Sequence, residues 1–283
     1  MDWESGRRSD NVEDRRGMGR PVAIGGGATL IVLILGLLFG FDPSQLLALL
    51  GQTDTAPSGT AQSTAPVQGS PAEERQKDFV SFVLASTEDT WPSILAAQGV
   101  RYVPPKLVLF RGGVESACGF AESASGPFYC PLDQMVFLDL AFFDELARRF
   151  GAPGDFAQAY VVAHEIGHHV QKQLGIFDKT DALRRRGGTV ANQVSVLQEL
   201  QADCFAGVWA NQANRKRPML QAGDVEAGLR AAAAVGDDTI QRRARGYVVP
   251  ESFTHGSAEQ RTTWFRRGFE SGQIDACDTF AAR

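Results

Sequence analysis

Three of the four histidines of this 283-residue chain lie between His164 and His169, inside the segment VVAHEIGHHVQ. Apolar residues recur on both sides of this stretch and Gly175 follows it, so residues 155–174 are predicted to form one long helix. On an α-helix, His164 and His168 are one turn apart and project from the same face. Because the apolar flanks indicate a largely buried helix, these polar side chains are expected to have partners.

Two imidazoles one turn apart can bind one metal ion, and Glu165 projects beside them, where it can reach a water molecule bound to that ion. This HExxH arrangement is typical of two zinc ligands and a general base. His169 points about 100° away around the helix, so we expect it to be structural or to support a ligand. The alternative is a helix with incidental polar residues.

A tetrahedral catalytic zinc site requires a third protein ligand and an open position for water. Gln171 and Leu174 exclude the metzincin extension, which has glycine and histidine at these positions. The helix predicted over residues 192–214 instead offers Glu199 and, one turn later, Asp203. Glu199 is predicted as the third ligand and Asp203 as the acceptor for the far nitrogen of a ligating histidine. A solvated acidic pair is the alternative.

The chain has four cysteines and no CxxC pair, which argues against a zinc ribbon and a thioredoxin-type site. An even number suits two disulfides in an oxidising compartment. Cys118 and Cys130 flank a loop rich in glycine and serine and are predicted to pair. A bond between Cys204 and Cys277 would then hold the C-terminal segment against the helix that carries Glu199. Four reduced, buried thiols are the alternative.

Residues 22–41 form an uncharged run that is long enough to cross a membrane as a helix. Arginines precede this run, and the next basic residue after it is Arg75. The positive-inside rule therefore predicts a single-pass protein of the inner (cytoplasmic) membrane, with a cytoplasmic N-terminal tail, residues 1–21, and a periplasmic or extracellular domain. A cleaved signal peptide and a buried core helix are the alternatives, but the run is longer than the apolar region of a signal peptide.

The polar composition of residues 42–72 predicts a flexible extracytoplasmic linker. Residues 73–283 are then the folded domain, which is large enough for one core. The predicted class is α+β, mostly helical, with a small sheet before the histidine-bearing helix and one transmembrane helix at the start. The predicted helices cover residues 74–87, 141–151, 155–174, 192–214, 224–236 and 257–272, and the predicted strands residues 106–110 and 134–140.

The formal net charge of −5 gives no basic signal for nucleic acid. Two local arginine clusters, within residues 184–186 and 242–245, lack interleaved aromatic residues. They are interpreted as solvated faces, so no nucleic-acid partner is expected.

The segments AHEIGHHVQ, ELQADCFAG, FTHGSAEQR and ACDTF together resemble the bacterial neutral zinc metallopeptidase family of membrane-anchored proteins. HExxH followed by ExxxD also resembles the gluzincins in general. The resemblance covers most of the chain from Arg7 onward, except the linker. It implies a minimal gluzincin-like zincin domain, because the chain is much shorter than thermolysin. It also implies one Zn²⁺ bound by His164, His168 and Glu199, with Glu165 as the base.

The resemblance further implies an edge strand that binds an extended substrate, for which residues 134–140 are a candidate; an ordinary core strand is the alternative. It also implies a histidine or tyrosine that stabilises the oxyanion. His255 is the candidate, two residues before Ser257, the predicted N-cap of the last helix. The helix N-terminus is expected to keep this ring neutral. Tyr160 and Tyr247 are the other candidates, and a purely structural histidine is the remaining alternative.

These features predict a membrane-anchored, zinc-dependent peptidase. A water activated by zinc, with a glutamate base, would hydrolyse peptide bonds of extracytoplasmic proteins or peptides. The alternative is a membrane-tethered zinc-binding envelope protein without hydrolytic activity, because nothing in the sequence excludes an occluded cleft.

Overall fold

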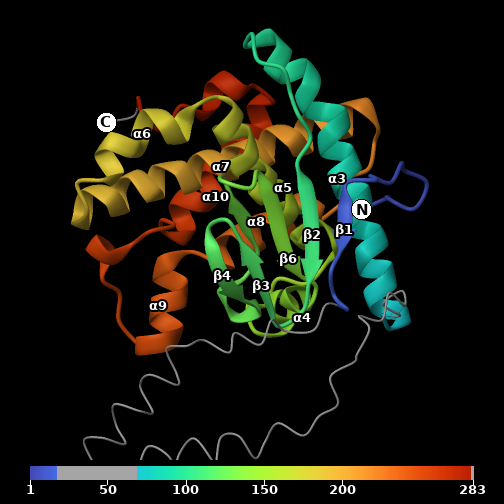
Figure 1. Ribbon diagram of the computed structural model, residues 1–283, viewed down its shortest axis with the longest axis horizontal. Coiled ribbons are helices and arrows are strands. Elements are labelled where there is room, and N and C mark those ends of the chain that lie inside the picture. Colours follow the sequence, from blue (N-terminus) through green and yellow to red (C-terminus); the bar gives the residue numbers. More distant parts are fainter. Residues whose placement is uncertain (18–68, 282–283) are drawn as a thin grey trace, which may run out of the picture.

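The computed structural model describes residues 1–17 and 69–281 (Figure 1). The run 22–41 and most of the predicted linker lie outside the described residues. In the part of the chain that the structure describes, no helix is long and apolar enough to cross a membrane. The mostly helical α+β class with a small sheet is confirmed, whereas the transmembrane helix has no support from these residues.

The four-stranded sheet has the order β1-β2-β6-β5. β2 (Lys106–Phe110) and β6 (Met135–Asp139) are the two predicted strands, and they pair in parallel. Both consist mainly of buried aliphatic and aromatic residues, as expected for strands covered on both faces. β5 (Phe128–Cys130) pairs antiparallel with β6 and forms one edge. Because β6 lies between two strands, the expectation that a substrate pairs with it is wrong.

The other edge strand, β1 (Val12–Asp14), comes from the N-terminal segment and pairs in parallel with β2. Figure 1 shows it in blue beside helix α3 (Pro71–Ala97). The prediction of a separate N-terminal tail is therefore wrong for residues 1–17, which are part of the folded domain. β1 has only three residues, two of them acidic, so its sequence shows neither the length nor the β-branched composition typical of a strand. It is identified only by its pairing with β2.

A hairpin of β3 (Gly113–Ser116) and β4 (Gly119–Glu122) lies between β2 and β5 in the chain and forms a separate two-stranded sheet. The predicted disulfide between Cys118 and Cys130 joins the hairpin turn to β5. The second predicted disulfide, Cys204–Cys277, is also present.

Helices α5 (Asp155–Gln173), α7 (Gly188–Lys216) and α10 (Ala258–Ser271) pack together, and they carry most of the candidate site residues discussed below. The predicted capping box at the start of α10 is present. A second capping box starts α3, which is longer than predicted at both ends. The remaining helices are α4 (Ala141–Arg148), α6 (Ile176–Arg184), α8 (Asp224–Ala234) and α9 (Asp237–Arg245), with short 3-10 helices at Ser123–Ser125, Pro250–Ser252 and Ile274–Cys277.

Glycines allow these central helices to approach closely. A Cβ atom on Gly167 of α5 would lie 2.9 Å from the backbone oxygen of Ala202 on α7. A Cβ atom on Gly268 of α10 would lie 1.9 Å from the backbone oxygen of Cys204 on α7. Because any larger residue would force the backbones apart, these contacts set how near side chains of α5 and α10 come to those of α7.

Candidate metal centre

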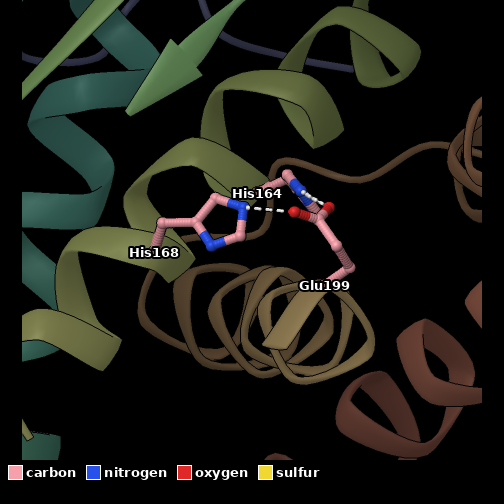
Figure 2. Close-up of side chains that lie close together, drawn as sticks. All are labelled: His164, His168 and Glu199. Carbon is pink, nitrogen blue, oxygen red and sulfur yellow. Dashed lines mark hydrogen bonds and ion pairs between the residues drawn. The ribbon is translucent and has the colours of Figure 1, made fainter. Parts of the chain in front are cut away.

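The three predicted ligands converge between α5 and α7. Figure 2 shows His164 and His168 pointing toward Glu199. His164 Nε2 lies 3.1 Å from Glu199 Oε2, and His168 Nε2 lies 3.4 Å from Glu199 Oε1. One ligand atom from each residue lies within 4.8 Å of the other two. These separations suit zinc, because tetrahedral ligands about 2.0–2.1 Å from the ion are about 3.3 Å apart.

The far nitrogens of both histidines have oxygen partners. His164 Nδ1 lies 2.9 Å from Asp203 Oδ1, and His168 Nδ1 lies 2.9 Å from Gln171 Oε1. An N–H at each Nδ1 leaves the Nε2 lone pair free for a metal. The Gln171 amide donates to the backbone oxygen of Gln198 at 2.7 Å, which turns its own oxygen toward His168. Its position three residues after His168 is the signal that could have identified this role.

Arg261 of α10 holds the carboxylate of Asp203. Its Nε lies 2.8 Å from Asp203 Oδ2 and its Nη2 lies 3.0 Å from Oδ1, which is a bidentate ion pair. Tyr160 donates its hydroxyl to the same carboxylate. The side chains of Asp203 and Arg261 are 0% and 4% exposed, so each charge is compensated inside the protein. Sequence reasoning missed Arg261, because nothing in the local pattern of α10 points to a partner 58 residues earlier.

Charges in this cluster shift the pKa of the ligands. Burial lowers the pKa of His164, but Asp203 and Glu199 raise it to about 10. Burial raises the pKa of Glu199, but His168 and His164 outweigh this effect and hold it well below its usual range. Burial likewise raises the pKa of Asp203, and Arg261 and His164 lower it below its usual value. Binding of a divalent metal would therefore displace a proton from this ion-paired cluster.

Glu165 lies next to the first ligand on α5 and is 8% exposed. Burial raises the pKa of its carboxyl group, although the neighbouring histidines oppose this shift. A raised pKa brings a carboxylate closer to the value that suits a general base near neutral pH.

His169 points to the other side of α5, toward the sheet. It is 1% exposed, and the Tyr129 hydroxyl of β5 lies 3.1 Å from its Nδ1. Its Nε2 lies 2.7 Å from the backbone oxygen of Val103. Burial lowers its pKa to about 4, so the neutral ring accepts from Tyr129 and donates to Val103. This structural role agrees with the prediction from the helix geometry.

His255 precedes α10, and its side chain is 51% exposed. Its Nδ1 lies 3.2 Å from Asp237 Oδ1, and the Asp237 carboxylate also accepts the backbone N–H of His255. Hydrogen bonding to Asp237 raises the pKa of His255, a shift in the direction opposite to the one expected from the helix N-terminus. Of the two alternatives, Tyr160 is buried with its hydroxyl bound to Asp203, whereas Tyr247 is 61% exposed.

The family described as "Putative neutral zinc metallopeptidase" matches residues 1–280. "Uncharacterized protein YpfJ" of Escherichia coli (strain K12) is 45% identical over 292 residues, which cover 99% of this chain and 99% of that protein. "Uncharacterized protein Rv2575" of Mycobacterium tuberculosis (strain ATCC 25618 / H37Rv) is 44% identical over 207 residues, or 70% of this chain and 68% of that protein. No solved structure matches the chain. The family match and the three-ligand geometry agree, and the chain belongs to the neutral zinc metallopeptidase family so described.

Proposed function

We propose that this protein is a zinc-dependent peptidase that hydrolyses peptide bonds of extracytoplasmic proteins or peptides. The observation that carries the proposal is the convergence of His164, His168 and Glu199 from two helices, with Glu165 beside them on the same helix. The family match supports the same class of reaction.

Zinc held by these three residues would supply an activated water and a Lewis acid for the substrate carbonyl. Glu165 accepts a proton from the attacking water and delivers it to the leaving amine. Asp203 and Gln171 keep the imidazoles in the tautomer that presents Nε2. His255 is proposed to donate a hydrogen bond to the oxyanion, which its raised pKa favours.

An extended substrate is proposed to pair along β5, the sheet edge on the side of the active helix. The hydrogen bond between Tyr129 and His169 ties this strand to α5. A fixed distance between strand and helix would hold the scissile bond in a constant position relative to the ligands.

The two disulfides favour an oxidising compartment for the domain. The uncharged run 22–41 supports attachment to a membrane. A zinc-binding envelope protein without hydrolytic activity is the second candidate.

The test compares the purified full-length protein with Glu165→Gln and with Glu226→Gln, an exposed control. We expect one zinc per chain in all three and cleavage of a peptide library by all except Glu165→Gln. Peptidase activity that persists in Glu165→Gln would contradict the mechanism. Zinc binding without any cleavage by the unsubstituted protein would favour the second candidate.

The role of His255 is tested separately. His255→Ala should retain zinc and lose about 10²–10³-fold in turnover, which is typical of removing one oxyanion donor. Unchanged turnover would remove His255 from the mechanism, and loss of zinc would show that it acts as a ligand.

A further inference from the structure

The first residues of the chain are anchored on the metallopeptidase domain. The N-terminal amine lies 3.2 Å from Asp224 of α8. Trp3 is 3% exposed and donates its indole N–H to Asp155 of α5 at 3.0 Å. Its ring also packs edge-on against Phe79 of α3. A buried tryptophan with its N–H paired indicates docking in a specific position.

The arginines that predict a cytoplasmic N-terminus are used in this docking. Arg7 lies 2.8 Å from Glu88, and Arg8 lies 2.6 Å from Asp78; both acidic residues belong to α3. The positive-inside rule counts basic residues that interact with the membrane and its potential. Arg7 and Arg8 are instead explained by their ion pairs with acidic residues of the same domain. Counting them as topology signals therefore does not place the N-terminus in the cytoplasm.

The last described residues of the segment lie beside the start of α3. Buried Arg16 pairs with Asp14 and with Glu74 of α3, each at 2.7 Å. A Cβ atom on Gly69 would lie 2.8 Å from Arg16 Nη1. Gly69 therefore lies against the side chain of Arg16, the residue that precedes Gly17.

This arrangement is incompatible with a single membrane crossing between Gly17 and Gly69. One crossing would separate the two ends by a hydrocarbon core of about 30 Å, and β1 could not pair with β2. Residues 42–68 contain no second uncharged run of about 20 residues that could return the chain.

We propose that Met1–Gly17 lies on the same side of the membrane as the metallopeptidase domain, as a built-in first strand of its sheet. The family model matches residues 1–280 and therefore includes this segment together with the domain. The proposal replaces the predicted opposite placement of tail and domain, and it does not depend on peptidase activity.

Thiol labelling of the full-length protein in its native membrane tests this. All four native cysteines are in disulfides, so a single introduced cysteine is the one free thiol. Asp10→Cys probes the N-terminal segment and Glu226→Cys the domain, since both positions are exposed. A membrane-impermeant maleimide should modify both before permeabilisation of the membrane, or both only afterwards. Modification of one before and the other only after permeabilisation would overturn the proposal.

Thermal unfolding of the same full-length protein tests the docking itself. Trp3→Ala removes the buried anchor and should lower the Tm by about 10 °C. Asp10→Ala, an exposed change in the same segment, should leave the Tm unchanged. If Trp3→Ala and Asp10→Ala had the same Tm, the segment would not be docked and the proposal would fail.

Discussion

His164 and His169 lie on the same helix, but they face opposite surroundings. On the metal side of α5, which faces α7, Asp203 and Glu199 raise the pKa of His164 to about 10 in spite of its burial. On the sheet side, His169 meets a phenol and a carbonyl, and burial lowers its pKa to about 4. The comparison shows that neighbouring carboxylates raise the pKa of a buried histidine, whereas burial among neutral groups lowers it.

Each side also has its own disulfide. Cys204 follows Asp203 on the metal side and bonds to Cys277, 73 residues away. Cys130 follows Tyr129 on the sheet side and bonds to Cys118, 12 residues away. A disulfide that spans 73 residues and ionic contacts therefore support the metal side, whereas a disulfide that spans 12 residues and neutral hydrogen bonds support the sheet side.

The largest effect is expected from breaking the ion pair on the metal side. Arg261→Met leaves the Asp203 carboxylate buried without its main counter-charge, which should cost about 3–5 kcal/mol of the free energy of unfolding. Arg266→Met on the exposed face of the same helix is the control and should change it little. Urea unfolding measures both variants, and equal stabilities would show that the pair is not essential.

The two disulfides should differ in the stability they provide. In the chain-entropy model, the long loop closed by Cys204–Cys277 is worth about 4 kcal/mol and the short loop closed by Cys118–Cys130 about 3 kcal/mol. Replacing each pair with alanine and measuring denaturant unfolding gives the two values. A larger loss for the short loop would mean that native packing, not loop length, decides their contributions.

The burial of His169 on the sheet side should make the free energy of unfolding depend on pH in a defined direction. His169 has a lowered pKa when folded, so the unfolded state binds its proton first as the pH falls. The contribution of His169 to the free energy of unfolding is complete above about pH 6.5. It is lost as the pH falls toward 4, and the loss is at most about 3 kcal/mol. Unfolding of metal-free wild type and His169→Gln across this range measures the difference.

His255→Gln is the control, because His255 should affect the pH dependence of stability in the opposite direction to His169. Asp237 raises the pKa of His255, so its contribution is present at acidic pH and is lost as the pH rises through the folded value. If both variants changed the pH profile in the same direction, the assigned environment of His169 would be wrong.

The smallest effect is expected at the hydroxyl of Tyr129. Tyr129→Phe removes the hydrogen bond to His169 Nδ1 and should cost about 1 kcal/mol in unfolding free energy. Tyr247→Phe, at an exposed position, is the matched control and should have no effect. A slower peptidase with unchanged stability would instead indicate that the bond positions β5 for substrate.

Local patterns predicted much of the site. The spacing of His164 and His168 places them on one face because the turn of an α-helix is constant. The apolar composition of α7 made Glu199 and Asp203 conspicuous as polar residues in a buried segment. The start of α10 was predictable because a capping box is a contact between residues three apart. In each case the sequence pattern lies within one or two helical turns.

Contacts between distant segments had no such signal. β1 was taken for part of a separate tail, β6 for a candidate edge strand, and Arg261 was not identified. The order of strands depends on which segments meet in space, and the charge of Asp203 is compensated from a different helix.

The sequence by itself therefore predicted the three residues that converge at the candidate metal centre, the disulfide pairs and the mostly helical class, because residue types, helical spacing and an even number of cysteines point to them. Only the tertiary structure decided which histidine has a raised pKa and which a lowered one, which strand forms the edge, and where the first 17 residues lie. Burial and counter-charges come from packing between segments far apart in the chain, and helical periodicity contains no information about that packing.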